Sequence, residues 1–385
     1  MERSSISLPE YTRRAGGVAT TFQTRDEDEA DERGQLTVAF AKPAACRFAS
    51  SPPRSYLLGN MQTAVCRPRR FPEVDAMPAQ PLRHSLVALR ARVPDDAFTA
   101  DVLGTERSGS GVVIGDNGLV LTIGYLITEA DEVWLTRHDG RVIAGHALAY
   151  DQATGFGLVK AVGDLDLPAL AFGNSAAAKV GTKITLADGV GQSVEGEIVA
   201  RQEFAGYWEY LLDSAIFTAP EHPSWGGAAL VGPDGRLLGI GSLRLEMMQA
   251  GDIAGINMSV PIDLLKPILD DLVMRGKTPA PPRPWLGAYA AEQNGAVIVM
   301  SVADGGPADA AGLRRGDVIA ELRDKEVQGL ADFYRTLWSS GQVGTEMPLR
   351  VVRDGRESWL RVKPVDRAAL LRHAPQGREG PLRSQ

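Results

Sequence analysis

The sequence predicts a mainly β protein with two folded units, and three observations support this fold class. From about residue 86 onward, short apolar segments are separated by turn residues at intervals of about 8 to 12 residues, as in all-β barrels and sandwiches. These segments fall into two successive sets, which predicts two β units in series. A proline-rich stretch, residues 277–284, follows both sets and predicts a stiff linker to a second, smaller unit.

Composition limits the class of protein before any motif is considered. A chain of 385 residues has room for two domains and tails, and 44% apolar with 23% charged residues is typical of globular proteins. The net charge of −7 argues against a general nucleic-acid binder, which is normally basic. No run of apolar residues is long enough for a transmembrane helix, so we expect no membrane span.

Residues 1–84 are expected to form a disordered N-terminal extension. They contain an acidic run at 25–33 and scattered prolines, without a sustained period of 2 or 3.6 residues. Such a composition buries too little apolar surface to offset chain entropy. The only two cysteines, Cys46 and Cys66, lie in this extension, and we expect free thiols rather than a structural disulfide.

No export signal is legible in the extension. Two arginine pairs, at 13–14 and 69–70, are each followed by a segment too short or too polar for the apolar core of a signal peptide. A start of translation at Met61 or Met77 is an alternative that would remove most of the extension. In either case the sequence favours a cytoplasmic location.

The first set of β segments begins with a hairpin in which residues 109–114 and 119–122 flank an Asp-Asn-Gly turn at 116–118. A second hairpin pairs 132–136 with 142–147 across Asp139-Gly140, and 158–162 continues the set. The second set consists of residues 183–187, 195–200, 207–212, the stretch 213–240 and 255–259.

A helix is expected to close the second β unit. Its apolar residues recur at helical spacing and would form one face that caps this unit. They are Leu264, Leu265, Ile268, Leu269, Leu272 and Val273.

Segments along the whole of this region, including the hairpin at 133–155 and the closing helix at 258–276, resemble trypsin-like serine proteases of the HtrA/DegP type. Residues 108–122 (SGSGVVIGDNGLVLT) resemble the family's segment before the catalytic histidine, and residues 167–189 resemble its Leu-Pro and Val-Gly strand region. Residues 213–240 resemble the segment around the nucleophile, including a glycine pair at 226–227 and Gly239-Ile240. The resemblance implies a trypsin-like double β-barrel at residues 85–276.

The resemblance also implies that all three catalytic triad positions are substituted. Tyr125 stands at the histidine position and Gly155 at the aspartate position. Counting back from Gly239 puts Gly226 at the serine position, whereas aligning the glycine pairs puts Trp225 there, and neither has a hydroxyl. A phenol with a reference pKa of about 10 cannot replace imidazole as the general base near neutral pH.

A displaced nucleophile is the alternative within this loop. His222 lies two residues before Ser224, but neighbouring loop side chains rarely meet in the geometry of a Ser–His pair, and Pro223 stiffens the connection. We expect His222 to be a solvated loop residue, and His138 and His146 to lie on strand surfaces. No cluster of His, Cys and carboxylates has metal-ligand spacing, so we expect neither a metal nor another cofactor.

Residues 285–366 resemble the PDZ domain that follows the protease domain in this family. The match lies in Gly-Pro-Ala at 306–308, Ala-Gly-Leu at 311–313 and Gly-Asp-Val-Ile at 316–319. The resemblance implies an α+β unit. Residues 367–385 are expected to be a disordered C-terminal tail.

A PDZ domain binds an extended peptide as an added strand. Carried onto this sequence, the carboxylate-binding loop is expected at Trp285, Leu286, Gly287 and Ala288, whose backbone N–H groups would face the terminal oxygens of the peptide. The other wall of the groove is expected on the helix 330–338, with some side chains in the core and at least two lining the groove. The candidates are Leu330, Phe333, Tyr334 and Leu337.

The leading functional hypothesis is therefore an inactive HtrA-like pseudoprotease that binds peptides or protein C-termini. It would act as a scaffold, a chaperone-like binder or a regulator, in a homo- or hetero-trimer with HtrA-type proteins. An active serine endopeptidase of protein quality control is the alternative that family resemblance alone implies. A third possibility is that the N-terminal extension directs the protein to its partner.

Overall fold

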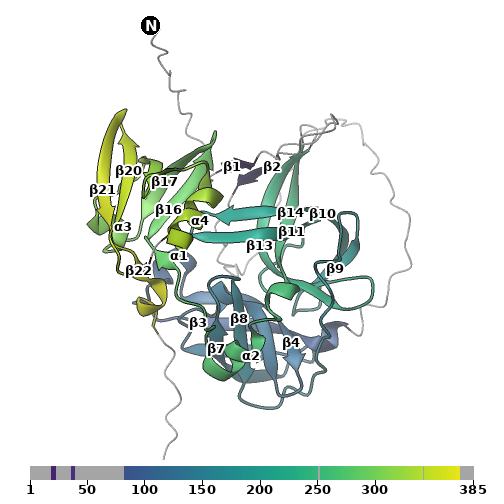
Figure 1. Cartoon of the computed structure of the whole chain (residues 1–385). Coiled ribbons are helices and arrows are strands. Elements are labelled where there is room, and N and C mark those ends of the chain that lie inside the picture. The colour runs from purple at the N-terminus through teal and green to yellow at the C-terminus, as the bar shows by residue number, and fades with distance from the viewer. Residues whose placement is uncertain (1–18, 23–35, 40–81, 250–251, 341, 373–385) are drawn as a thin grey trace, which may run out of the picture.

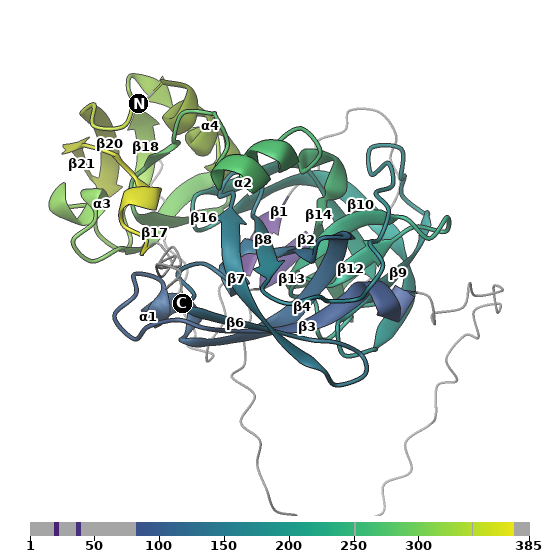
Figure 2. The ribbon, with the colours of Figure 1, turned by 90° about the horizontal axis from the view of Figure 1, so that it is seen from below.

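The computed structural model describes residues 19–22, 36–39, 82–249, 252–340 and 342–372. Over these residues the protein is mostly β, and Figure 1 shows two neighbouring barrels with a C-terminal unit to one side. The view from below in Figure 2 shows the same arrangement. The expected fold class of a trypsin-like double barrel followed by an α+β unit is thus confirmed.

The first barrel is closed and has a core of aliphatic side chains that alternate along its strands. Leu89, Leu121 and Leu158 are completely buried there. Local turn chemistry sets its hairpins, since Gly118 adopts φ +76° in the turn after β4. In order around the barrel, the strands are β3 (Leu86–Arg92), β4 (Glu106–Gly115), β5 (Leu119–Ile123), β8 (Phe156–Ala161), β7 (Val142–Tyr150) and β6 (Glu132–Thr136).

The second barrel is also closed, and its apolar core includes Leu186, Ile198 and Leu230. Its long strands β10 and β11 pair as an antiparallel hairpin down to Gly206 and Tyr210. Residues 207–209, expected as the start of a strand, instead form the turn of this hairpin. The strand order is β10 (Ser193–Gly206), β11 (Tyr210–Ala219), β14 (Asp252–Pro261), β13 (Leu237–Gln249), β12 (Ala229–Val231) and β9 (Lys183–Ala187).

The closing helix lies elsewhere than expected. The turn η3 (Ile262–Leu264) contacts β13 of the second barrel, but helix α2 (Leu269–Arg275) contacts β7 of the first barrel. Leu272 is fully buried and Leu264 is 39% exposed. The predicted apolar face is therefore divided between the barrels: its first residues pack on the second barrel, whereas helix α2 packs on the first.

The C-terminal unit is a sheet flanked by two helices, with its own apolar core. Two barrel residues, Ala205 and Leu211, join that core from the ends of β10 and β11. The sheet order is β16 (Ala288–Gln293), β17 (Ala296–Val302), β18 (Val318–Leu322), β20 (Met347–Arg353) and β21 (Arg356–Val362). The other elements are β19 (Lys325–Glu326), the pair β15 (Pro284–Trp285) and β22 (Val365–Asp366), and helices α3 (Pro307–Ala310) and α4 (Leu330–Ser340).

The ends of the chain are only partly described. Within 1–84, β1 (Ala19–Phe22) pairs with β2 (Leu36–Ala39) between β13 and β16, and η1 (Leu82–Ser85) leads into β3. The rest of the extension lies outside the described residues, including Cys46 and Cys66. At the other end, η4 (Arg367–Ala369) is ordered, and the N–H of Arg372 donates to Glu129 of the first barrel, so the C-terminal tail begins later than 367.

Candidate functional site

The first candidate centre lies between the barrels, where β5 runs into the short turn η2 (Gly124–Leu126). Tyr125, expected at the histidine position, points its phenol across to the second barrel and donates a 2.9 Å hydrogen bond to the carbonyl of Ser242. Burial raises the pKa of this phenol above its ordinary value, and a hydrogen bond with the Trp225 side chain only partly offsets that effect. Tyr125 is therefore a neutral hydrogen-bond donor that connects the two barrels.

The Gly226-Gly227 pair faces this tyrosine. A Cβ added at Gly226 would lie 3.0 Å from the Tyr125 hydroxyl. Gly227 has φ +77°, and a Cβ there would lie 2.0 Å from the carbonyl oxygen of Ser110. The glycines thus allow the loop backbone to pack against β4, whose Ser110 N–H donates to the Gly226 carbonyl at 2.8 Å.

Gly155, expected at the aspartate position, lies beside a second tyrosine. Its φ of +83° is left-handed, and an added Cβ would meet the Tyr210 hydroxyl at 3.0 Å. That hydroxyl donates to the Thr154 carbonyl at 2.6 Å. Burial raises the pKa of the Tyr210 phenol well above its ordinary value, so it too stays neutral.

His222 is buried, so the expectation of a solvated loop histidine is wrong. Its Nδ1 accepts a 3.0 Å hydrogen bond from the Ser224 N–H, and its Nε2 lies 3.3 Å from the Gln192 carbonyl. The N–H of His222 donates to the side chain of Asn257. Nε2 must carry the proton, because its partner is a carbonyl, and Nδ1 accepts from a backbone N–H. Both ring nitrogens therefore form hydrogen bonds that hold the loop.

The second candidate centre is the loop at the start of β16. The N–H groups of Leu286, Gly287 and Ala288 all point at one carboxylate, at 3.1, 2.8 and 3.2 Å from Oε1. The carboxylate is that of Glu209, in the turn between β10 and β11. Burial raises the pKa of the Glu209 carboxyl to about 7, although the three N–H groups favour its charged form.

The other predicted binding residues lie around this loop. Trp285 is buried and meets Phe98 of the first barrel edge-to-face, with ring centroids 5.7 Å apart. The four predicted residues of α4 are all buried, and Tyr334 faces the barrel hairpin: its hydroxyl donates to the Gly206 carbonyl at 2.8 Å and accepts from the Glu209 N–H at 3.2 Å. The structure therefore brings the predicted loop and helix together, with the hairpin between them.

Sequence reasoning missed Glu209. The run Tyr-Trp-Glu-Tyr at 207–210 favours a strand by composition, and the single glycine before it, Gly206, is a weak turn signal. Glu209 nevertheless has φ +59°, which is uncommon outside glycine, asparagine and aspartate. The signal available in the sequence was one acidic residue among aromatic ones, and it is too weak to assign a contact.

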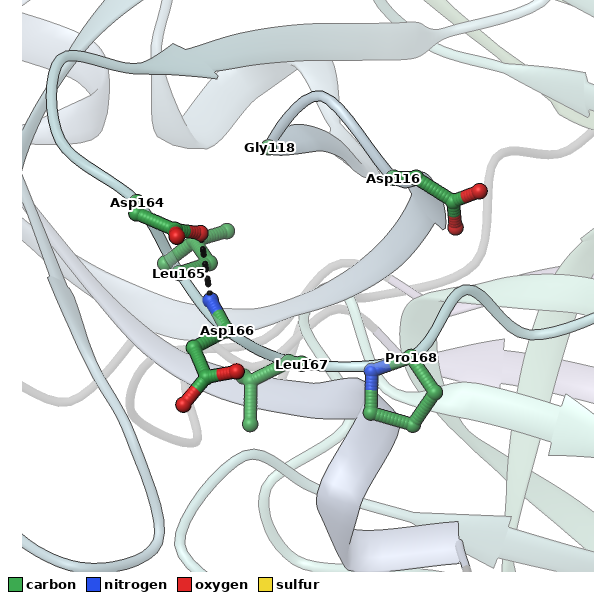
Figure 3. A pocket seen from close by; sticks show the side chains of 7 residues that line it. All are labelled: Asp116, Gly118, Asp164, Leu165, Asp166, Leu167 and Pro168. Atoms are coloured by element: carbon green, nitrogen blue, oxygen red, sulfur yellow. Dashed lines mark hydrogen bonds between the residues drawn. The ribbon is translucent and has the colours of Figure 1, made fainter.

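A surface hollow of about 290 Å³ lies away from both centres, beside the turn at Gly118 (Figure 3). Three of its lining residues, Asp116, Asp164 and Asp166, are acidic, and Figure 3 shows their carboxylates spread around the hollow without converging. Asp164 accepts from the N–H of Asp166. No group of side chains in the described ranges could hold a metal ion, and no helix among them is long and apolar enough to cross a membrane.

Two family models match the chain. The trypsin-like peptidase domain matches residues 109–240 and the PDZ domain matches residues 284–363. Both candidate centres fall in or beside the matched regions, since the peptidase match contains Tyr125, Gly155 and Gly226, and the PDZ match contains the loop 285–288.

The chain is similar to several curated proteases. It is 24% identical over 287 residues to the serine protease Do-like HtrA of Bacillus subtilis, covering 66% of this chain and 63% of that one. It is 28% identical over 269 residues to a protein of Chlamydia pneumoniae named "Probable periplasmic serine endoprotease DegP-like", covering 64% and 53%. The protein of that name in Hahella chejuensis is 27% identical over 281 residues, covering 67% and 57%. The chain thus spans between about half and two thirds of these relatives.

Solved structures give similar matches. The HtrA-type protease AlgW with a decapeptide aligns with 22% identity and a TM-score of 0.46, covering 77% of this chain and 98% of that one. The serine endoprotease from Yersinia pestis aligns with 21% identity and a TM-score of 0.46, covering 76% and 99%.

The comparisons correct one expectation from the sequence. Relatives from Hahella, Pseudomonas and Chlamydia are named periplasmic proteases, which contradicts the cytoplasmic location inferred from the lack of a legible signal. The lack of a legible export signal was a weak argument for a cytoplasmic location, because the sequences of the folded domains carry no export signal in either case. With both domain matches in the expected order, the chain consists of a trypsin-like peptidase domain followed by a PDZ domain, and over both domains it is similar to HtrA/DegP-type serine proteases.

Proposed function

We propose that this chain is a catalytically inactive HtrA-like protein that binds peptides or protein C-termini through its PDZ domain. The observation that supports inactivity is the arrangement of Tyr125 against Gly226, with no hydroxyl opposite the base position. The trypsin-like unit is proposed to span residues 85–276 and the PDZ unit 285–366, joined by the linker 277–284.

The proposal of inactivity rests on three local arguments. The phenol of Tyr125 donates to the Ser242 carbonyl and has a raised pKa, so it cannot accept a proton from a nucleophile near neutral pH. Gly155 offers no carboxylate to orient a base. The Ser224 N–H, two residues before Gly226, is bonded to His222, which removes a donor that an oxyanion hole at this loop would need.

The proposal of peptide binding rests on the carboxylate-binding loop. The backbone N–H groups of Leu286, Gly287 and Ala288 already converge on a carboxylate, which is the chemistry that a peptide C-terminus would present. Trp285 and the four predicted residues of α4 position this loop and the helix opposite it. The proposed ligands are therefore chains with a free C-terminal carboxylate.

An active serine endopeptidase is the second candidate, because the relatives are named as serine proteases. In this chain it would require Ser224 as a displaced nucleophile. The hydrogen bond from the Ser224 N–H to His222 Nδ1 leaves that ring without a free basic nitrogen. Covalent labelling of Ser224 by a fluorophosphonate would establish this second candidate.

Location and assembly belong to the same proposal. Because relatives are named periplasmic, we propose that this chain acts outside the cytoplasm. A role as scaffold, chaperone-like binder or regulator fits an inactive barrel pair with a peptide-binding unit. Assembly into a trimer, with itself or with an active HtrA-type protein, is the corresponding proposal for partners.

A comparison of free and amidated peptides tests the binding function. Peptides with an apolar last residue and a free carboxylate are expected to bind the whole chain, measured by fluorescence anisotropy up to millimolar concentration. Amidation is expected to weaken binding by roughly 1.5–3 kcal/mol, since it removes hydrogen bonds to a charged group. Equal affinities of the two forms would show that residues 286–288 do not bind the terminal carboxylate.

A further inference from the structure

The turn between β10 and β11 is docked into the PDZ domain. We call residues 206–210 the barrel hairpin tip. Figure 1 shows α4 at the ends of the second-barrel strands, and α4 contacts both β10 and β11. Ala205 and Leu211, which flank the tip, are buried in the PDZ core cluster. The two domains thus share one apolar core around this tip.

The hairpin tip runs alongside the start of β16, joined to it by one backbone and one side-chain hydrogen bond. The Ala288 N–H bonds to the Glu209 carboxylate at 3.2 Å, and the Ala290 N–H bonds to the Tyr207 carbonyl at 3.1 Å. The contact two residues further along β16 is made by the residue two positions back along the tip, so the two segments run in opposite directions, as an added antiparallel strand would. This is the pattern by which a peptide is expected to add to β16, with the carboxylate at the loop.

The opposite wall of the groove is also engaged by the tip. Tyr334 of α4 bonds through its hydroxyl to Gly206 and to the N–H of Glu209, at 2.8 and 3.2 Å. Tyr207 packs against Tyr289 with ring centroids 6.2 Å apart. Backbone, carboxylate and helix contacts therefore all fall on the same five-residue tip.

Two further features show that docking holds the tip in place. Glu209 has φ +59°, a conformation that costs a non-glycine residue free energy and persists only where its surroundings fix it. Outside the groove, Arg335 of α4 forms ion pairs with Glu203 of β10 and Asp213 of β11. These pairs connect the PDZ helix to the strands on both sides of the tip.

We propose that the barrel hairpin tip is an intramolecular ligand of the PDZ domain, in which the Glu209 side chain takes the place of a peptide's C-terminal carboxylate. The inference rests on the proposed peptide-binding function. Since Leu286, Gly287 and Ala288 can serve only one carboxylate at a time, a free C-terminus must displace Glu209 to bind. The groove is then closed at rest, and only ligands that outcompete the tip open it.

The Glu209→Ala variant tests this competition. It removes the carboxylate and leaves the loop and α4 intact, so a free-carboxylate peptide is expected to bind roughly tenfold or more tightly than to the unmodified chain. Glu195→Gln, an exposed position on the same strand β10, is the matched control and is expected to change nothing. The double variant Glu203→Gln/Asp213→Asn loosens the tip from outside the groove, and is expected to raise affinity about two- to fivefold.

Hydrogen exchange gives a readout that needs no peptide. In Glu209→Ala, the amides of Leu286, Gly287 and Ala288 are expected to exchange faster than in the unmodified chain, because their acceptor is gone. Unchanged exchange, or equal peptide affinity in the unmodified chain and the variant, would overturn the intramolecular ligand. If these amides exchange faster in Glu209→Ala but neither the variant nor the unmodified chain binds the peptide, the proposed peptide-binding function is wrong. The displacement of Glu209 by a peptide is then wrong as well.

The pH dependence of peptide binding is a separate expected result. Docking raises the pKa of Glu209 from its ordinary value of 4.5 to about 7, mainly through burial, with Arg367 nearby favouring the charged form. The neighbouring phenols of Tyr334 and Tyr289 have raised pKa values and stay neutral. Docking therefore takes up a proton, so it is strongest below about pH 4.5 and weakens as the pH rises through about 7.

A peptide carboxylate stays ionised over this range, so its apparent affinity is expected to rise roughly tenfold or more from pH 5 to pH 8. The measurement is anisotropy with a peptide that has no other titrating group. Glu209→Gln keeps an acceptor oxygen but cannot titrate, and its affinity is expected to be flat over the same range. If the affinity of the unmodified chain varies with pH as little as that of Glu209→Gln, Glu209 does not change its protonation when the tip leaves the groove.

Discussion

The purified chain is expected to hydrolyse unfolded casein no faster than a buffer blank. Loss of a catalytic triad in proteases of this geometry costs on the order of 10⁶ in turnover, or about 8 kcal/mol of barrier. The measurement is release of labelled casein fragments, with an active HtrA-type protease as the positive control. Labelling by a fluorophosphonate is expected to be absent as well, because Tyr125 at the histidine position would not activate a hydroxyl as imidazole does.

Repair of single positions is expected to fail for identifiable reasons. Gly226→Ser supplies a hydroxyl, but its Cβ would lie 3.0 Å from the Tyr125 hydroxyl, and no base is present. In the triple variant Tyr125→His/Gly155→Asp/Gly226→Ser that contact is removed. Position 155 then becomes the obstacle, since an aspartate there would adopt φ +83° and meet Tyr210 at 3.0 Å. We expect the triple variant to stay folded and inactive.

Addition of Tyr210→Phe to the triple variant is the matched next step, because it removes the hydroxyl that blocks position 155. Circular dichroism melting curves show whether each variant is folded, so that inactivity is not confused with unfolding. Casein cleavage by the unmodified chain that Ser224→Ala abolishes would refute the inactive reading and establish a displaced nucleophile.

Gly227→Ala is expected to lower the free energy of unfolding by about 4 kcal/mol or more, and the apparent Tm by roughly 10 °C. A Cβ at this position would lie 2.0 Å from the Ser110 carbonyl and 2.6 Å from the Thr122 hydroxyl. Ser110 belongs to β4 and Thr122 to β5 of the first barrel, and strand pairing fixes the backbone of both residues. An added methyl group could be accommodated only if the loop moves away from these strands.

Gly140→Ala is the control that separates crowding from backbone strain. Gly140 has φ +86°, but nothing lies within 4 Å of an added Cβ. Its substitution is expected to cost only about 1–2 kcal/mol, the penalty of a left-handed alanine. Differential scanning fluorimetry of both variants gives the comparison. Equal shifts in Tm would show that the contact between the glycine loop and β4 is not tightly packed.

The sequence by itself determined the local hairpins and the absence of triad side chains at positions 125, 155 and 226. Alternating apolar residues and an Asp-Asn-Gly turn specify a hairpin such as β4–β5 locally, because side chains of a strand alternate between faces and the turn glycine adopts φ +76°. The lack of a hydroxyl at 226 and of an imidazole at 125 is equally a property of the residues. These conclusions needed only neighbours in the chain.

Contacts between distant residues were decided by the tertiary structure alone. Tyr125 meets the Ser242 carbonyl across a separation of 117 residues, and Glu209 meets Leu286 across 77. No local period encodes either contact. The same limit explains the wrong location of α2 and the buried state of His222, since both depend on which surface the chain crosses.

The turn at 207–209 shows the physical reason most clearly. Its aromatic residues favour a strand, and strand propensity is weak enough for packing to override it. The buried contacts of Gly206, Tyr207 and Glu209 with the PDZ domain hold the backbone at φ +59° instead. What the residues prefer is read from the sequence, whereas which partner binds the Glu209 carboxylate is settled only when two domains are brought together.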